Sequence, residues 1–254
     1  MIDLLILTSC IAPPKQDFLK LCDHEVRYNQ TLECIKFFLN SKTFKRIVLC
    51  DGSGFEIKDQ ELENISITSN TELELLTFKQ DFQKVKDLGK GYGEGQIMDY
   101  ILENSRLFKS SSFFIKVTGR LVVENIKPLV DKLNSSNTYF NIYPSKYLGC
   151  VDTRVYAMPT SLYVGKFRAC YKSVNDAQRH SYEFCFTDVI NENRIKIHYF
   201  PEVPRISGIS GTNNKPYRQD AVYYVECILT KLHLMNTKLA AFLIIMVRTV
   251  FNRF

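Results

Sequence analysis

Residues 46–54, RIVLCDGSG, contain an apolar run that stops at an acidic residue and two glycines. A short apolar run bounded by turn residues is typical of a buried strand in a parallel sheet. Residues 3–8, DLLILT, form a similar run. Between the two runs, apolar side chains over residues 23–39 recur at the spacing of an amphipathic helix. The order strand, helix, strand predicts a right-handed βαβ unit and a parallel sheet.

The same alternation continues beyond this unit. We expect strands over residues 73–78 and 113–118, with a helix over residues 96–108 between them. The second half should contain three more strands and one mainly helical stretch: residues 139–143, 151–158 and 195–199 as strands, and residues 163–190 as helix. The predicted fold class is α/β, an open, mostly parallel, doubly wound sheet with a C-terminal helical extension.

The length of 254 residues, with 45% apolar and 24% charged residues, suits one large domain with a small appendage. We expect residues 1–220 to form that domain. Residues 201–217 are rich in Gly, Pro, Ser and Asn, which predicts a long loop that serves as a lid or a binding loop.

Residues 221–254 are strongly apolar and are expected to be helical. The uninterrupted apolar run, residues 239–247, is shorter than the roughly 20 residues that span a bilayer. Basic residues flank it: Lys231, Lys238, Arg248 and Arg253. This mixture predicts a helix in the interface of an anionic membrane, or a terminal helix that packs on the sheet or on a partner subunit.

The net charge of +6 is compatible with phosphate-bearing ligands. The basic residues are scattered, without a block of the kind that binds nucleic acid, so we expect no nucleic-acid partner. The eight cysteines include no C-x-x-C pair, which favours buried free thiols over a zinc site. The first residues lack the basic region of a signal peptide, and we expect a cytoplasmic protein.

Three short motifs follow or precede the predicted elements of the first half. Asp51 and Gly52 end the strand of residues 46–50, at the edge where open α/β sheets bind ligands. The Asp51 carboxylate could accept hydrogen bonds from a base or a ribose, and Gly52 would allow close backbone approach. The alternative is an ordinary strand-ending turn.

Residues 90–95, KGYGEG, place three glycines directly before the predicted helix. Backbone N–H groups around Gly91, helped by Lys90, could bind a diphosphate, and Glu94 adds a carboxylate. The motif is neither a P-loop nor a dinucleotide fingerprint. A flexible loop that caps a helix is the alternative.

Residues 113–120, FFIKVTGR, end a buried-type strand with two cations, a hydroxyl and a glycine. Lys116 and Thr118 share one face of that strand, and Gly119 and Arg120 follow it. Two cations here could neutralise a leaving diphosphate without a metal ion. A solvated edge strand is the alternative.

The second half contains two candidate acceptor groups. Asp152 and Arg154 could orient an acceptor, or could form a structural ion pair. Glu183 lies in the mainly helical stretch and could deprotonate an acceptor hydroxyl. It could equally be a buried glutamate paired with Arg179 or Lys172. No Asp-x-Asp motif ends a strand, so we expect no metal ion and no other cofactor.

These residues resemble the nucleotide-sugar-binding glycosyltransferases of the GT-A fold. The strand with Asp-Gly-Ser, residues 46–53, resembles the element by which many such enzymes hold a nucleotide. Where the common pattern has a metal-binding Asp-x-Asp, this chain has KVTGR at residues 116–120. With residues 90–94 and 182–183, the pattern over residues 2–217 is similar to a metal-independent bacterial subgroup. That subgroup builds O-antigen and capsule polysaccharides and includes galactosyl- and galactofuranosyltransferases.

The resemblance implies transfer of a hexosyl group from a nucleotide diphosphate sugar, a UDP-sugar by preference, to a lipid-linked glycan at the inner-membrane surface. Residues 1–125 would bind the donor and residues 126–220 the acceptor. The implied roles are nucleotide contact for Thr8, Asp51 and Lys90, diphosphate contact for Lys116 and Arg120, and acceptor contact for Glu183. Two other functions stay open: a nucleotidyltransferase of sugar activation, and a non-catalytic membrane-associated scaffold. The sequence does not indicate an oligomeric state.

Overall fold

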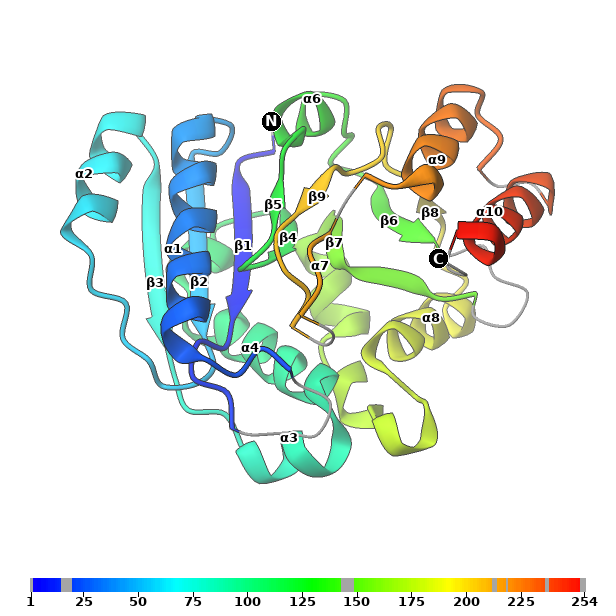
Figure 1. Ribbon diagram of the computed structural model, residues 1–254. Coiled ribbons are helices and arrows are strands. Elements are labelled where there is room, and N and C mark those ends of the chain that lie inside the picture. The colour runs from blue at the N-terminus through cyan, green and yellow to red at the C-terminus, as the bar shows by residue number, and fades with distance from the viewer. Residues whose placement is uncertain are drawn as a thin grey trace.

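The computed structural model describes residues 2–14, 20–142, 149–211, 214–217, 219–235 and 238–251. Within these residues seven strands form one sheet, in the order β3-β2-β1-β4-β7-β6-β8 (Figure 1). The strands are β1 (Leu4–Ser9), β2 (Arg46–Asp51), β3 (Glu72–Thr77), β4 (Phe113–Thr118), β6 (Thr138–Ile142), β7 (Val151–Pro159) and β8 (Ile197–His198). All pairings are parallel except those of β7, which runs opposite to both of its neighbours. The predicted mostly parallel α/β sheet is confirmed.

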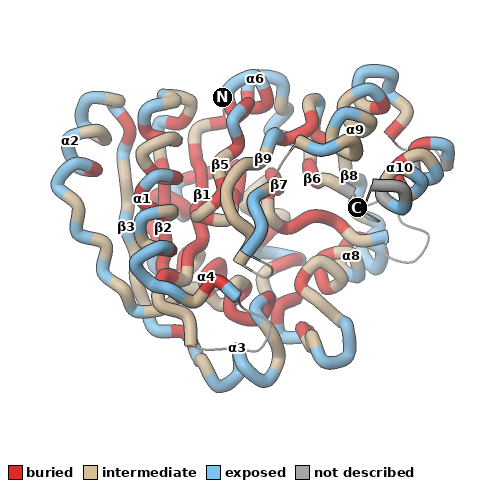
Figure 2. The backbone as a smooth tube through the Cα atoms, in the orientation of Figure 1, coloured by how far each residue is buried: buried red, intermediate tan, exposed pale blue. Residues whose placement is uncertain are grey.

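Helices cover both faces of the sheet, because neighbouring side chains of each strand point to opposite sides. Leu5 and Leu7 of β1 pack in one core with α1 (His24–Ser41) and α2 (Gln60–Ser69). Leu4 and Ile6 belong to the other core, with α4 (Lys90–Asn104) and α8 (Tyr182–Glu192). The central strands are almost entirely buried between these layers (Figure 2). The sheet is therefore doubly wound, as predicted.

Short elements connect these layers, and the sequence pattern predicts few of them. They are α3 (Phe82–Leu88), α5 (Arg106–Lys109), β5 (Val122–Val123), α6 (Ile126–Val130), α7 (Thr160–Leu162), a π-helix (Tyr163–Phe167), 3₁₀ turns (Cys170–Ser173 and Asp176–Gln178) and β9 (Ile206–Ser207). The stretch expected to be mainly helical is thus a series of helical turns followed by α8. All eight cysteines are free thiols, and four of them are buried.

The prediction of a glycine-rich loop over residues 90–95 is wrong, because α4 begins at Lys90. A Cβ atom at Gly91 would overlap Tyr182, and one at Gly95 would overlap Tyr171. The glycines therefore let the first turns of α4 lie against the residues around Tyr171 and Tyr182. This packing offsets the low helix propensity of glycine. The helix also ends earlier than expected, at Asn104, before the separate turn α5.

The single helix predicted for residues 221–254 is two helices, α9 (Ala221–Lys231) and α10 (Lys238–Phe251), which pack on each other as a helical hairpin (Figure 1). His233, at φ 56°, adopts the left-handed conformation just after α9. Arg253 and the side chains of Lys238 and Arg248 lie outside the described residues. None of the described helices is both long and apolar enough to cross a membrane.

Candidate active site

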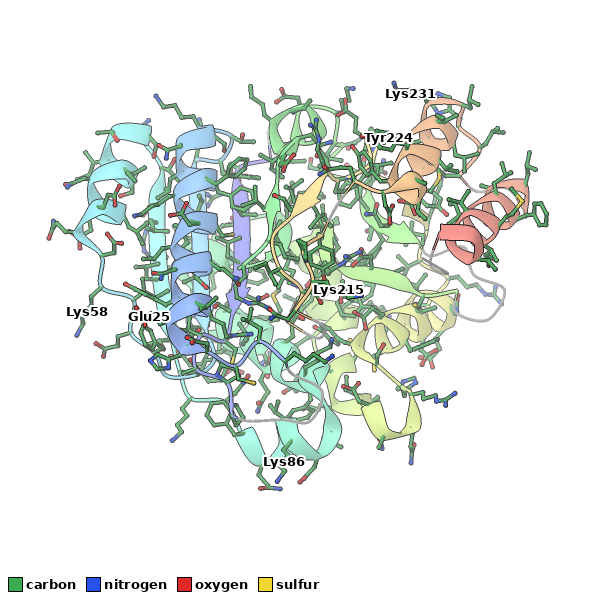
Figure 3. The ribbon with its side chains drawn as sticks, in the orientation of Figure 1. Glu25, Lys58, Lys86, Lys215, Tyr224 and Lys231 are labelled. Carbon is green, nitrogen blue, oxygen red and sulfur yellow. The ribbon has the colours of Figure 1, made fainter. Side chains whose placement is uncertain are left out.

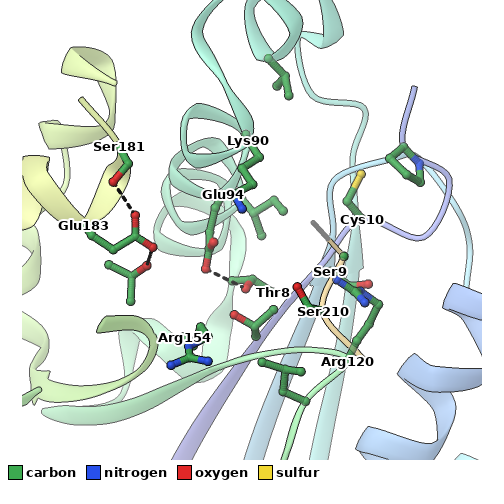
Figure 4. A pocket seen from close by; sticks show the side chains of 18 of the residues that line it. Thr8, Ser9, Cys10, Lys90, Glu94, Arg120, Arg154, Ser181, Glu183 and Ser210 are labelled. Atoms are coloured by element: carbon green, nitrogen blue, oxygen red, sulfur yellow. Dashed lines mark hydrogen bonds between the residues drawn. The ribbon is translucent and has the colours of Figure 1, made fainter. Parts of the chain in front are cut away.

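A cavity of about 550 Å³ opens at the carboxyl ends of β1 and β4 (Figure 4). Thr8 and Ser9 end β1, and Thr118 ends β4. Because β7 runs the opposite way, its first residues reach the same edge of the sheet. β2 and β4 lie on opposite sides of β1, so the cavity sits at the point where the strand order reverses. Open α/β sheets bind their ligands at this position.

Segments from both halves of the chain complete the wall of the cavity. The first turns of α4 supply Lys90 and Glu94, and α1 supplies Arg27. The segment predicted as a binding loop contains β9, which pairs with β5. The residues after β9 then line the cavity, among them Ser210 and Tyr217.

Lys116 lies beneath this wall, with its side chain completely buried. Its ammonium group pairs with the Glu94 carboxylate and donates to the Thr153 carbonyl oxygen at 2.8 Å and to Thr118 Oγ1 at 3.2 Å. Burial lowers the pKa of Lys116 to about 7, although the carboxylates of Asp152 and Glu183 act in the opposite direction. The predicted direct contact between Lys116 and a diphosphate is therefore corrected. Lys116 holds Glu94 in place from behind.

Glu94, which pairs with the buried Lys116, lines the cavity. Its carboxylate also accepts a hydrogen bond of 3.4 Å from Thr8 Oγ1, and a quarter of its side chain is exposed. A carboxylate fixed by Lys116 and Thr8 can accept hydrogen bonds from hydroxyl groups of a ligand.

Two arginines lie on another side of the cavity. Arg120 follows β4 and donates to Gln30 Oε1 and to the Ile209 carbonyl oxygen, both at 3.3 Å. Arg27 donates to the Cys10 carbonyl oxygen at 2.8 Å and to that of Leu21 at 3.1 Å. In the part of the chain that the structure describes, no carboxylate forms an ion pair with either.

The two guanidinium groups influence each other. Burial lowers the pKa of Arg120 to about 10, and the nearby charge of Arg27 contributes to that decrease. Both side chains line the cavity. An anion bound between them would offset their mutual repulsion.

Asp51 and Gly52, predicted to contact a nucleotide, do not line the cavity. The buried Asp51 carboxylate accepts hydrogen bonds from the backbone N–H of Ile11 at 2.7 Å and of Ser53 at 2.8 Å. A Cβ atom at Gly52 would overlap Ile97. This is a correction: Asp51 fixes the loop after β1, and that loop carries the cavity residues Ser9 and Cys10.

The side of the cavity formed by β7 and α8 contains the predicted acceptor residues. Glu183, in the first turn of α8, accepts hydrogen bonds from Thr153 at 2.9 Å and from Ser181 at 2.7 Å (Figure 4). Asp152 binds the Arg154 guanidinium through Nε at 3.0 Å and through its terminal nitrogen at 2.6 Å. Thus Glu183 has a hydrogen-bond donor on each carboxylate oxygen, and its orientation is fixed.

The structure brings together most of the residues that the sequence singled out. Those that line the cavity are Thr8, Lys90, Glu94, Thr118, Arg120, Asp152, Arg154 and Glu183. Five predicted residues do not line the cavity: Asp51, Gly52, Gly91, Lys116 and Gly119. Gly119 packs against the backbone of Thr8. Sequence reasoning missed Arg27, Thr153, Ser181 and Tyr217. Thr153 and Ser181 lie beside the singled-out Asp152, Arg154 and Glu183, and Tyr217 ends the predicted binding loop, so only Arg27 lacked a local signal.

The cavity has two chemically different sides. Arg27 and Arg120 provide positive charge, whereas Glu94, Asp152 and Glu183 provide carboxylates. Its volume is within the range of sites that bind small molecules and cofactors. Within the described residues, no three His, Cys, Asp or Glu side chains lie together as a metal site would need.

Neither a protein-family model nor a curated protein sequence matches this chain. Solved structures that resemble it include the nucleoside-diphosphate-sugar pyrophosphorylase from Vibrio cholerae RC9, with a TM-score of 0.46 and 10% identity over 81% of this chain and 94% of that one. The glycosyltransferase GlyE of Streptococcus pneumoniae TIGR4 has a TM-score of 0.45 and 10% identity, over 76% of this chain and 44% of its own. A glycosyltransferase involved in glycosylation of the major capsid of PBCV-1 has a TM-score of 0.42 and 11% identity, over 78% and 80%. At this level of likeness, activity has to be inferred from the cavity itself.

Proposed function

We propose that this chain is a glycosyltransferase that moves a hexosyl group from a nucleoside diphosphate sugar, a UDP-sugar by preference, to a glycan acceptor. The proposal rests on the separation of positive and negative side chains between two sides of the first cavity. Two arginines without a described carboxylate partner line one side, and the fixed carboxylate of Glu183 lines the other. A nucleotide sugar has matching parts, because its diphosphate is anionic and its sugar is neutral.

In this arrangement the donor binds with its diphosphate between Arg27 and Arg120. Thr8, Lys90 and Glu94 surround the adjacent space and supply hydrogen bonds and charge for the nucleotide and the sugar hydroxyls. Guanidinium groups match the geometry of phosphate oxygens well, and their bonds to anions are strong.

The reaction then needs three events. An acceptor hydroxyl attacks C1 of the sugar, and Glu183 takes the proton from that hydroxyl. The bond between C1 and the diphosphate oxygen breaks, and the nucleoside diphosphate leaves with the electron pair. Arg27 and Arg120 stabilise the charge that develops on it. Because the protein supplies this positive charge, the proposed mechanism uses no metal ion or other cofactor.

We further propose a lipid-linked glycan as the acceptor, in bacterial O-antigen or capsule synthesis at the cytoplasmic face of the inner membrane. The resemblance of the sequence to the metal-independent subgroup supports the pathway, although Asp51 and Lys116 do not line the cavity. The helical hairpin supports the membrane surface, because Tyr224, Ile228 and Phe242 are more than half exposed on it.

Calorimetric titration with UDP in the presence of EDTA tests this function. We expect the wild-type protein to bind UDP, and Arg27→Gln and Arg120→Gln each to bind it about 10- to 100-fold more weakly. Hydrogen bonds between charged groups contribute about 1.5–3 kcal/mol. Arg106→Gln is the matched control, because this exposed arginine pairs with Glu72 far from the cavity. Binding that needs a divalent cation, or that survives both cavity substitutions, would contradict the proposal.

A further inference from the structure

A second cavity, of about 230 Å³, lies between the sheet and the inner side of α9. We call it the hairpin cavity. Its wall comes from β6 and β7, from the chain that follows β8 and β9, and from α9. The polar and aromatic residues that line it are Asn141, Asp152, Arg154, Tyr199, Phe200, Tyr217, Gln219, Asp220, Tyr223, Glu226 and Thr230.

The hairpin cavity adjoins the first cavity. Asp152, Arg154 and Tyr217 line both, so these three side chains form a shared wall. The wall is fixed, because Asp152 binds Arg154 through two nitrogens and the Arg154 guanidinium lies 4.9 Å from the centre of the Tyr217 ring. Two contiguous cavities can hold two ligands in contact distance, as a bimolecular transfer requires.

The charge of the hairpin cavity differs from that of the first. Its described lining includes three carboxylates, Asp152, Asp220 and Glu226, and one cation, Arg154, which Asp152 already binds. Asp220 caps α9 by accepting from the backbone N–H of Tyr223 at 3.0 Å.

The remaining lining combines flat apolar surfaces with hydrogen-bonding groups. Tyr199, Tyr217 and Tyr223 present aromatic rings with hydroxyls, and Gln219 and Thr230 present an amide and a hydroxyl. A sugar ring has the same two characters, apolar C–H faces and a rim of hydroxyls.

Helix α9 links this cavity to the surface of the molecule. Val222, Glu226 and Thr230 lie four residues apart and line the cavity. Ile228 and Leu232, on the opposite face, are 57% and 60% exposed. Tyr224 and Lys231 also lie on exposed parts of α9 (Figure 3). A ligand with a sugar and an apolar tail could contact both faces.

From these features we infer that the hairpin cavity binds a neutral sugar of the glycan acceptor, whose reacting hydroxyl extends past the shared wall to Glu183 and the donor in the first cavity. The inference rests on the proposed function, because it assigns the second substrate of the same reaction. Tyr217 and Arg154 are then the residues that contact both substrates.

The test fills the cavity from α9. Thr230→Trp places a large ring in the hairpin cavity, and Tyr224→Trp changes the opposite face of the same helix as the control. Saturation-transfer NMR with the methyl glycosides of glucose, galactose and mannose reports sugar binding. Calorimetry with UDP reports the state of the first cavity. Gln219→Ala provides a second cavity variant if Thr230→Trp does not fold.

We expect at least one methyl glycoside to bind the wild-type protein and Tyr224→Trp, in the presence of saturating UDP. The signal should fall at least severalfold in Thr230→Trp or Gln219→Ala, while UDP binding stays unchanged. Absence of glycoside binding to the wild type, or equal signals in all variants, overturns the inference. If UDP binds but no glycoside does, the sugar site in the hairpin cavity is wrong and the proposed function is still supported. Glycoside binding without nucleotide binding removes the proposed function and leaves the sugar site.

Discussion

Glu183 receives one hydrogen bond on each carboxylate oxygen, from Thr153 and from Ser181. Such bonds fix the orientation of the group and leave it facing the cavity. A general base held in this way contributes about 10²- to 10⁴-fold to a proton-transfer step.

We therefore expect Glu183→Gln to lower the rate of sugar transfer by about 10²-fold or more, because an amide cannot accept the proton. Affinity for UDP should stay close to that of the wild type. Glu192→Gln, at the exposed last residue of α8, is the matched control. If Glu183→Gln transfers sugar at the wild-type rate, Glu183 is not the general base.

Lys116 should make stability depend on pH in a defined window. Burial lowers its pKa to about 7 from an ordinary value of 10.5. Between these two values the unfolded chain keeps a proton that the folded chain has lost, so the free energy of unfolding rises with pH. Below pH 7 both states are protonated, and the full cost of burying the charge is present. The buried Cys34 and Cys50 thiols, whose pKa values burial raises, oppose the rise above about pH 9.

Urea unfolding of the wild type and Lys116→Met at pH 7 and pH 9 measures this effect. The wild type should gain stability on the order of 2 kcal/mol relative to the variant, since one pKa unit corresponds to about 1.4 kcal/mol. A stability difference that is the same at both pH values would show that Lys116 keeps its proton when buried.

At the scale of single residues, the sequence indicated where charged groups gather but not which of them are exposed. Lys116 lies near the end of one predicted strand and Asp51 directly after another, yet each is completely buried and supports a neighbouring segment. Their burial depends on α4 and on the loop after β1, which lie far away in the sequence. Arg27 was missed for the converse reason, because nothing within α1 shows that this face meets the end of β1.

At the scale of elements, α4 shows how tertiary packing overrides local propensity. Three glycines in six residues predicted a loop, whereas two of them, Gly91 and Gly95, let α4 pack closely against Tyr182 and Tyr171. Those aromatic residues lie some eighty positions later in the chain. The helical hairpin was likewise not predictable from local sequence. Residues 232–237 contain no Gly or Pro that would predict the break between α9 and α10.

The hairpin carries most of the large apolar side chains that the described structure exposes. They are Tyr224 and Ile228 on α9, Leu232 just after it, and Leu239, Phe242 and Met246 on α10. Residues 221–254 contain four basic residues and one acidic residue, Glu226. A segment with exposed apolar side chains and an excess of basic residues in its sequence is suited to the surface of an anionic membrane.

We expect the wild-type protein to co-sediment with vesicles that contain phosphatidylglycerol, and more weakly with neutral phosphatidylcholine vesicles. The double substitution Ile228→Ser and Phe242→Ser should abolish most of the binding, because each buried apolar side chain contributes about 1.5–3 kcal/mol. Ile67→Ser, at a 76% exposed position of α2, is the control. A wild-type protein that binds neither kind of vesicle but forms a dimer through Phe242 would contradict the proposed membrane binding.

At the scale of the whole molecule, the apolar pattern predicted β1, β2, β3 and β4, because buried parallel strands are continuous apolar runs. The strands predicted for residues 139–143, 151–158 and 195–199 are observed as β6, β7 and β8, although β8 has only two residues. The antiparallel direction of β7 was not predicted. The two-residue strands β5 and β9 were not predicted either, because their pairing depends on neighbours rather than on a pattern of their own.

The complete fold brings both halves of the chain to one edge of the sheet. The first cavity combines residues as distant as Thr8 and Tyr217, and the hairpin cavity adds α9. The central claim is that these cavities hold the donor and the acceptor of a glycosyl transfer.

Product analysis after incubation with nucleotide sugars tests that claim most directly. The protein is incubated with EDTA and with UDP-, GDP- or dTDP-hexoses, with methyl glycosides and water as acceptors. We predict release of the nucleoside diphosphate from one class of donor, with the hexose on the glycoside or on water, and loss of this release in Glu183→Gln. Absence of nucleoside diphosphate from every donor would contradict the account. So would formation of a nucleotide sugar and pyrophosphate in a parallel incubation with a nucleoside triphosphate, a sugar phosphate and Mg²⁺.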